Sequence, residues 1–171
     1  RELMPKKEVL VYLFGTVALL VAVPVIIIYI GYRFNAPFMP PLLVSSIFGA
    51  VTSALGLFFT VWANIELKRK GKGGPAVFGK IKLMQETSVL VTTGPYALCR
   101  NPMHLGVFLF YLGLCCSVNS LYSLIIPLMF GIFAYCFAVF LDEPRLRRDF
   151  GAEYEKWAAC TPRFLPKNYK K

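Results

Sequence analysis

Long uncharged stretches alternate with short charged stretches along the chain. Residues 9–32 form one run of 24 uncharged residues, and residues 42–65 form another run of 24. A helix rises about 1.5 Å per residue, so each run exceeds the roughly 20 residues that cross ~30 Å of hydrocarbon. We therefore predict two transmembrane helices, of which the second carries small residues for close helix packing at Gly49, Ser53 and Gly56.

A third apolar run, His104–Val118, has 15 residues and would extend about 22 Å as a helix. A two-residue link joins it to Leu121–Leu141, which is long enough to cross a membrane. The pair predicts a tight helical hairpin whose first arm is shallow or begins before Pro102. We expect an all-α integral membrane protein with four transmembrane helices, and a fifth only if the chain continues before Arg1.

Composition supports the membrane class. Hydrophobic residues make up 57% of the 171 residues, including 15 Phe, whereas charged residues make up 16%. This balance fits neither a soluble globular domain nor a disordered chain.

The positive charges predict an orientation. Lysine and arginine number three before the first span, one between the first two spans, seven from residue 68 to residue 100, none in the hairpin link and eight after residue 141. Of these 19 residues, 18 therefore flank one side of the membrane, and the positive-inside rule places both termini and the central loop in the cytoplasm. The basic residues flank the spans, so we attribute the net charge of +10 to this topology and to binding of anionic lipids. We therefore expect no nucleic-acid partner.

Cysteine and histidine do not predict a metal site or a disulfide framework. His104 is the one histidine, and the five cysteines show no C-x-x-C spacing: Cys99, Cys115, Cys116, Cys136 and Cys160. Three of these cysteines fall within apolar runs, where cysteine usually packs as a small hydrophobic residue.

The central loop carries a first polar block. Residues 71–75 are rich in glycine and predict a connector after the second helix, and residues 88–93 have an extended character. Gly94 and Pro95 predict a turn, and Pro102 suits the first turn of the next helix. Unpaired amides at that helix start can receive an anionic or polar small molecule.

A second polar block follows the last span. Asp142 and Glu143 lie where this helix leaves the bilayer, and Pro144 predicts an interruption of its hydrogen bonds. The next segment predicts an interfacial amphipathic helix. Its apolar face comprises Leu146, Phe150, Tyr154, Trp157 and Ala158.

Charged residues of this amphipathic helix predict two local ion pairs. Glu143 and Arg147 have the i, i+4 order that favours a pair, and Arg145 and Asp149 have the reverse order. Without further information, the preferred interpretation of these charges is a solvated basic face near lipid headgroups.

Together, four motifs resemble the isoprenylcysteine carboxyl methyltransferase family and its phospholipid methyltransferase relatives. In chain order they are GPYALCRNPMHLG, DE, FGAEYEKW and PRFLP, and the resemblance covers residues 85–166. Residues 1–84 match only in hydropathy. We therefore divide the chain into N-terminal transmembrane helices with a basic connector, 1–84, and a methyltransferase core, 85–171.

The resemblance implies a cytoplasmic pocket for S-adenosylmethionine, which leaves as S-adenosylhomocysteine. Three positions differ from residues often found in the family: Ser88 and Asn101 replace histidines, and His104 replaces a tyrosine. His104 also fits a helix cap, and Tyr96 fits an interfacial tyrosine. The implied cofactor-binding residues are Gln85, whose alignment needs a gap, Ser88, Val89, Leu90, Val91, Tyr96, Asn101, Pro102, Met103, His104 and Glu143.

The resemblance also implies methylation of the carboxylate of an isoprenylated cysteine or a similar lipidated acid. The catalytic residues would be Glu143, Arg145 and Arg163. Relatives carry an arginine upstream of the acidic pair, where this chain has Ala138 and Val139. One of Arg145, Arg147 and Arg163 must then hold the substrate carboxylate, and we favour Arg145, followed by Arg163.

Two other functions remain open at this point. The first is N-methylation of an aminophospholipid such as phosphatidylethanolamine, with Glu143 or His104 as the base. The second is a non-enzymatic membrane scaffold. The expected partners are a prenylated small molecule or protein C-terminus and membrane lipids, with neither nucleic acid nor metal.

Overall fold

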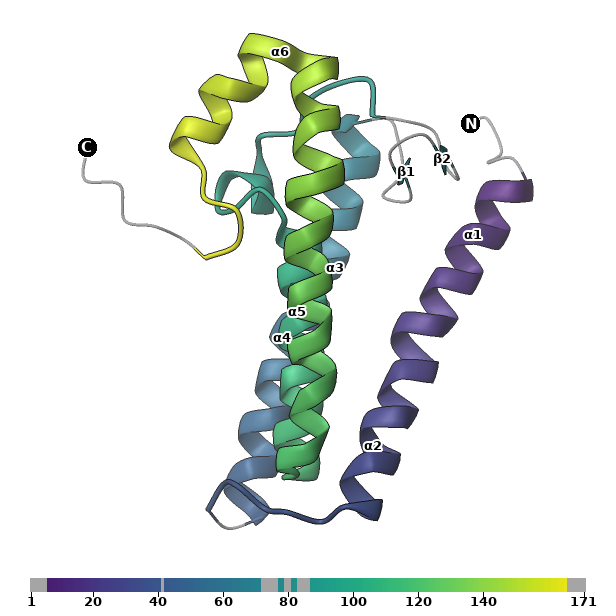
Figure 1. The fold of residues 1–171 in the computed structure, drawn as a ribbon, viewed down its shortest axis with the longest axis vertical. Helices are drawn as coiled ribbons and strands as arrows, with labels where there is room; N and C mark the ends of the chain where they lie inside the picture. The colour runs from purple at the N-terminus through teal and green to yellow at the C-terminus, as the bar shows by residue number, and fades with distance from the viewer. Residues whose placement is uncertain (1–5, 41, 72–76, 79–80, 83–86, 166–171) are drawn as a thin grey trace. The chain divides into compact units, whose positions relative to one another are not determined.

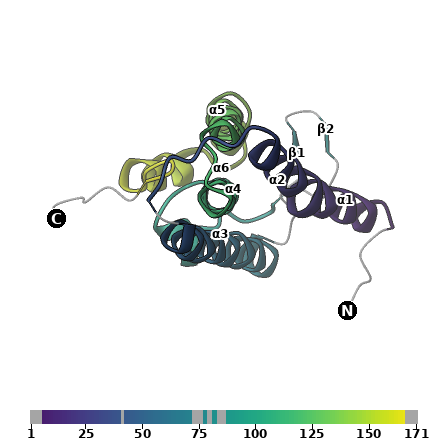
Figure 2. The same ribbon diagram turned by 90° about the horizontal axis from the view of Figure 1, so that it is seen from below.

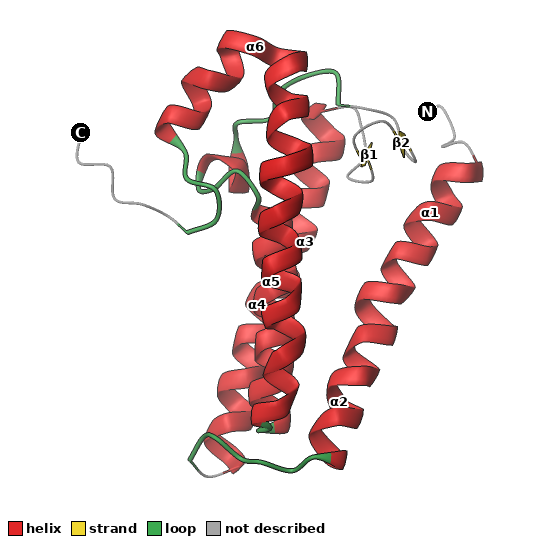
Figure 3. Ribbon diagram, in the orientation of Figure 1, coloured by secondary structure: helices red, strands yellow, loops and turns green. Residues whose placement is uncertain are grey.

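The computed structural model describes residues 6–40, 42–71, 77–78, 81–82 and 87–165. Helix dominates these residues, which confirms the all-α class (Figures 1 and 3). Two short strands, β1 (Val77–Phe78) and β2 (Ile81–Lys82), form an antiparallel pair. The helices are α1 (Lys6–Val17), η1 (Ala18–Ala22), α2 (Val23–Arg33), α3 (Leu42–Gly71), η2 (Gly94–Ala97), α4 (Pro102–Val118), η3 (Leu121–Leu124), α5 (Ile125–Phe137), η4 (Ala138–Asp142) and α6 (Glu143–Cys160).

Three helical stretches are long and apolar enough to cross a membrane. They are Val9–Arg33, Leu43–Gly71 and Leu121–Cys160, and they make this an integral membrane protein. The fourth predicted span, α4, has 17 residues and begins at Pro102, so the first arm of the hairpin is short, as predicted.

The helix after the hairpin continues past Pro144, and the predicted interruption of its hydrogen bonds takes the form of the π-helical turn η4 just before the proline. Pro144 lies in the first turn of α6, directly after the π-helical turn η4, and the same arrangement places Pro24 after η1. A proline is tolerated in a first turn because its missing N–H needs no partner there, and the π turn shifts the register before it. The true break in α6 is Gly151, with φ of 47° and ψ of −121°.

The chain forms two compact units. The first, unit 1, comprises Arg1–Phe58 and Gly106–Ile132, and the second, unit 2, comprises Phe59–Leu105 and Phe133–Lys171. The core of unit 1 is apolar and includes Ile27, Val107, Phe110, Tyr111 and Cys115. The division at residue 84 stays a prediction about function.

Within unit 1, α3 and α4 pack closely along their small residues (Figure 2). A Cβ atom added at Gly56 would collide with the backbone N of Phe110 and lie 2.6 Å from the carbonyl oxygen of Gly106. Backbone atoms cannot rotate away as a side chain can. The predicted use of small residues for helix packing therefore has a direct steric reason at this position.

Gly56→Ala should destabilise the protein by about 1–3 kcal/mol, because overpacking forces the two helices apart. Gly15→Ala is the matched control, since no heavy atom lies within 4 Å of its added Cβ. Alanine favours a helix over glycine by roughly 0.5–1 kcal/mol, so the control should be neutral or stabilising. Thermal unfolding in detergent measures both variants, and equal effects would contradict close packing at Gly56.

Candidate functional site

Unit 2 holds a loop, residues 87–93, that is tied to the end of α3. The N–H of Ser88 donates to the carbonyl oxygen of Gly71 over 2.9 Å. The hydroxyl of Thr93 donates to Glu66 Oε1 over 2.7 Å, and Lys70 Nζ donates to Thr93 Oγ1 over 2.6 Å. These bonds fix both ends of the loop, so its apolar side chains stay against the helix.

Residues 161–163, which we call the C-terminal strap, bind the start of α4. The N–H of Arg100 donates to the carbonyl oxygen of Pro162 over 2.8 Å. The N–H of Asn101 and its side-chain Nδ2 both donate to the carbonyl oxygen of Arg163, over 3.0 and 3.2 Å. The strap thus satisfies backbone groups just before the first turn of α4.

A buried carboxylate joins the strap to α6. Glu143 is only 4% exposed, and its Oε1 accepts a hydrogen bond of 2.5 Å from Arg163 Nε. Arg163 Nη2 donates to the other oxygen of Glu143 over 3.2 Å, and Arg100 Nη1 lies 3.2 Å from Oε1. The bond to Glu143 raises the pKa of Arg163 above its usual value. One carboxylate therefore pairs with two arginines from distant parts of the chain.

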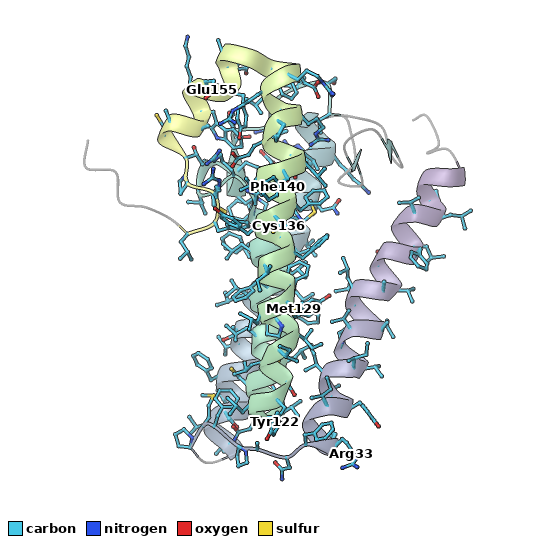
Figure 4. All side chains as sticks on the ribbon, in the orientation of Figure 1. Arg33, Tyr122, Met129, Cys136, Phe140 and Glu155 are labelled. Carbon is cyan, nitrogen blue, oxygen red and sulfur yellow. The ribbon has the colours of Figure 1, made fainter. Side chains whose placement is uncertain are left out.

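The prediction of two ion pairs from helical spacing in α6 is wrong. Arg147 Nε pairs with Glu155 Oε1 at 2.8 Å, and both side chains are more than half exposed; Figure 4 labels Glu155 on α6. Arg145 Nη2 pairs with Asp142 Oδ1 at 3.2 Å, one turn earlier along the chain. Glu143 turns instead toward Arg100 and the partly exposed Arg163, because burial of its carboxylate favours full pairing of its charge.

A cavity lies within unit 2, between the loop, the start of α4 and α6. It is lined mainly by apolar and aromatic side chains, with a few charged groups among them. Its lining residues are Leu67, Thr87, Val89, Leu90, Val91, Tyr96, Arg100, Asn101, Pro102, Met103, His104, Asp142, Arg145, Leu146, Phe150 and Trp157.

Three buried N–H groups of this lining have no hydrogen-bond partner within the described part of the chain. They are Arg100 Nε, Arg145 Nε and Trp157 Nε1. Arginine and tryptophan side chains donate hydrogen bonds and accept none. Since an unsatisfied buried donor costs roughly 1–3 kcal/mol, the cavity is suited to a molecule rich in acceptors. Two of the three donors belong to cations, which favours an anionic group such as a carboxylate.

Most of the predicted site residues come together around this cavity. Ser88 is exposed and does not line it, and Glu143 and Arg163 lie outside the lining. Gln85 falls outside the described residues. The roles of all these residues stay predictions. Those that line the cavity are Val89, Leu90, Val91, Tyr96, Asn101, Pro102, Met103, His104 and Arg145.

Sequence reasoning missed several lining residues, above all Arg100. It is adjacent to Asn101 in the motif, but the resemblance gives it no role. Asp142 was missed beside Glu143 in the same way. Leu146, Phe150 and Trp157 were expected on the apolar face of an amphipathic helix, and that face lines the cavity rather than only facing lipid.

The break at Gly151 explains how both halves of α6 reach the cavity. Phe150 precedes the break and Trp157 follows it, and both line the cavity. A residue with a Cβ is strained at a positive φ such as that of Gly151, so glycine suits this position.

Cys99 does not line the cavity. It is fully buried next to Arg100, and its burial raises the pKa of its thiol to about 11, despite an opposing hydrogen bond from the Asn101 backbone. A thiol with this pKa stays protonated near neutral pH, and only the thiolate is reactive. All five cysteines are free, and the described residues contain no group of three or more His, Cys, Asp or Glu that could hold a metal ion.

Comparison with known proteins gives a family match. The family model described as phospholipid methyltransferase matches residues 44–153. The nickel-cobalt-cadmium resistance protein NccN of Alcaligenes xylosoxydans xylosoxydans is 32% identical over 84 residues, 48% of this chain and 38% of that protein. The cobalt-zinc-cadmium resistance protein CzcN of Cupriavidus metallidurans is 33% identical over 84 residues with the same coverage. The match thus spans well under half the length of these relatives, and no solved structure matches.

Proposed function

The chain belongs to the phospholipid methyltransferase family, and from this premise we propose that it is an S-adenosylmethionine-dependent membrane methyltransferase. We further propose that it methylates the carboxylate of an isoprenylated cysteine or a similar lipidated acid. The observation that carries the proposal is the cavity with three partnerless N–H donors, Arg100 Nε, Arg145 Nε and Trp157 Nε1. These donors match carboxylate and hydroxyl acceptors.

The cavity lining fits the proposed cofactor. The apolar loop residues 89–91 and Tyr96 would pack against the nucleoside, and Asp142 would balance the ammonium group. When bound, S-adenosylmethionine supplies a methyl group on a positively charged sulfur. A carboxylate on the same molecule would satisfy partnerless donors of the lining.

The residues of this chain would then bind and align the acceptor. A terminal carboxyl group has an ordinary pKa of about 3.5, so it is ionised at neutral pH and needs no general base. Arg145 would hold this carboxylate in a two-pronged contact, while Leu146, Phe150 and Trp157 exclude water. Exclusion of water speeds the reaction because solvent otherwise stabilises the separated charges more than the transition state. Glu143 would keep Arg100 and Arg163 in place rather than touch the reacting atoms.

N-methylation of an aminophospholipid is the second candidate, and two observations favour it. The first is that the description of the matching family model is phospholipid methyltransferase. Asp142 and His104 also line the cavity, where either could accept the proton that a protonated amine must lose. Glu143 suits this task less well than the sequence suggests, because both of its oxygens accept hydrogen bonds from Arg163.

The dependence of rate on pH separates the two acceptors. A carboxylate with a pKa of about 3.5 is fully ionised above pH 6, so its methylation rate should be flat from pH 6 to about 8.5. An amine reacts only when deprotonated, so its rate should rise by up to about tenfold per pH unit below its pKa. Initial rates at saturating cofactor measure this, and a steep rise with pH would reject the carboxylate.

Methyl transfer itself is tested with radiolabelled S-adenosylmethionine. The purified protein in detergent is given farnesylated cysteine and phosphatidylethanolamine in parallel reactions. Label in the farnesylated cysteine is expected, and label in the phospholipid alone supports the second candidate. A protein that binds cofactor but labels neither acceptor contradicts both substrate assignments.

A scaffold without enzymatic activity predicts no response to the cofactor product. S-Adenosylhomocysteine should raise the unfolding temperature of the wild-type protein, because a ligand that binds only the folded state stabilises it. Tyr96→Ala should abolish this rise, since Tyr96 is buried and lines the cavity. An unchanged unfolding temperature of the wild type at saturating ligand would favour the scaffold.

We propose that the cavity and both termini lie on the cytoplasmic side. The support is the uneven distribution of lysine and arginine along the sequence. The cofactor would then enter from the cytoplasm and a prenyl chain from the bilayer.

A further inference from the structure

Tyr154 is a buried residue of α6 that sequence reasoning placed only on an apolar face. It is 1% exposed, and its hydroxyl oxygen accepts a hydrogen bond of 2.9 Å from Arg100 Nη1. Its ring packs edge-on against Trp157, with ring centroids 5.9 Å apart and an interplanar angle of 69°. Tyr154 itself does not line the cavity, but Arg100 and Trp157 do, whereas Arg147, whose guanidinium carbon lies 5.9 Å from the centroid of the Tyr154 ring, does not.

Arg100 and Trp157 carry two of the three cavity N–H groups that lack an acceptor. Arg100 Nη1 is occupied by Tyr154 and by Glu143, whereas Arg100 Nε has no partner among the described residues. The indole Nε1 of Trp157 likewise has none. Tyr154 therefore contacts both Arg100 and Trp157 and leaves the Nε of Arg100 and the Nε1 of Trp157 available to a ligand.

We infer that Tyr154 is a positioning residue that aligns Arg100 and Trp157 for the molecule bound in the cavity. This inference rests on the proposed function, since it concerns the ligand of the same site. Arginine has many rotamers, and fixing its guanidinium before binding reduces the entropy that the ligand must overcome. The hydroxyl of Tyr154 fixes the guanidinium of Arg100 in this way, and the ring of Tyr154 limits the rotation of Trp157.

Tyr154→Phe separates the hydroxyl from the ring. It removes one oxygen atom, and Arg100 keeps its ion pair with Glu143, so the fold should persist. We expect about tenfold weaker binding of S-adenosylhomocysteine, measured by calorimetry in detergent, because a hydrogen bond to a charged group is lost. Tyr122→Phe is the matched control, since Tyr122 is 59% exposed in unit 1 (Figure 4), and it should bind as the wild type does.

A double-mutant cycle tests whether Tyr154 acts through Arg100. In an Arg100→Met background, Tyr154→Phe should cause no further loss of affinity, because its partner is already gone. A purely structural contribution would weaken binding by the same factor in both backgrounds, and that result would overturn the inference.

Tyr154→Met removes the ring as well as the hydroxyl and keeps the position filled. It should weaken binding more than Tyr154→Phe, since Trp157 also loses its partner, and it provides the test if the Phe variant does not fold. Equal affinity of wild type and Tyr154→Phe overturns the inference while the proposed function stands. A folded wild-type protein that binds no S-adenosylhomocysteine overturns both.

Discussion

Arg145→Lys should lower the rate of methyl transfer by about 10²–10³-fold at subsaturating substrate. This is the typical loss when one preorganised donor is removed from an active site. Lysine keeps the charge opposite Asp142 but lacks the planar guanidinium and its Nε donor in the cavity lining. Arginine and lysine are therefore not equivalent at this position. The ratio kcat/KM for the methylated acceptor measures the effect.

Arg148→Lys is the matched control for this variant. Arg148 lies three residues further along α6, does not line the cavity, and pairs with Asp149 while its own side chain is 64% exposed. Its replacement should leave kcat/KM within about twofold of the wild type, since exposed pairs contribute little. Equal losses in the two variants would show that Arg145 does not contact the acceptor or the cofactor.

Glu143→Gln should produce the largest loss of stability, about 3–5 kcal/mol. Glutamine has nearly the same shape, but it leaves Arg100 and Arg163 close together without a counter-charge. The side chains of Arg100 and Glu143 are only 12% and 6% exposed, so water does not replace the lost carboxylate at Arg100, whereas Arg163 is 40% exposed and stays hydrated. Breaking a buried ion pair from one side is costly for this reason. Thermal unfolding in detergent should show a decrease of order 10 °C.

Glu155→Gln provides the comparison for Glu143→Gln. Glu155 also pairs with an arginine, but the side chains of this pair are 52% and 58% exposed. Loss of an exposed pair changes stability by about 0–1 kcal/mol. If the two glutamine variants unfold at the same temperature, the buried cluster around Glu143 does not stabilise the fold as proposed.

The sequence predicted features that depend on neighbouring residues. The spans follow from runs of uncharged residues, and the apolar face of α6 follows from helical spacing, so both could be found without a structure. The family resemblance likewise identified just over half of the residues that line the cavity.

Features that depend on distant residues could not be predicted in this way. Helical spacing proposed Arg147 as the partner of Glu143, whereas the actual partners, Arg100 and Arg163, lie far from it along the chain. Such pairs arise from tertiary packing, which no local pattern encodes. The form of the interruption at Pro144 could not be predicted either, because a π turn before the proline leaves no clear mark in the sequence.

The C-terminal strap has a consequence for biosynthesis. Arg100 and Asn101 form backbone hydrogen bonds with Pro162 and Arg163, which are translated some 60 residues later. These two bonds therefore cannot form while the strap is still inside the ribosome, even when the hairpin has already inserted into the bilayer. Translation that stalls just before Thr161 would leave a membrane-embedded nascent chain in which the backbone N–H groups of Arg100 and Asn101 lack these partners.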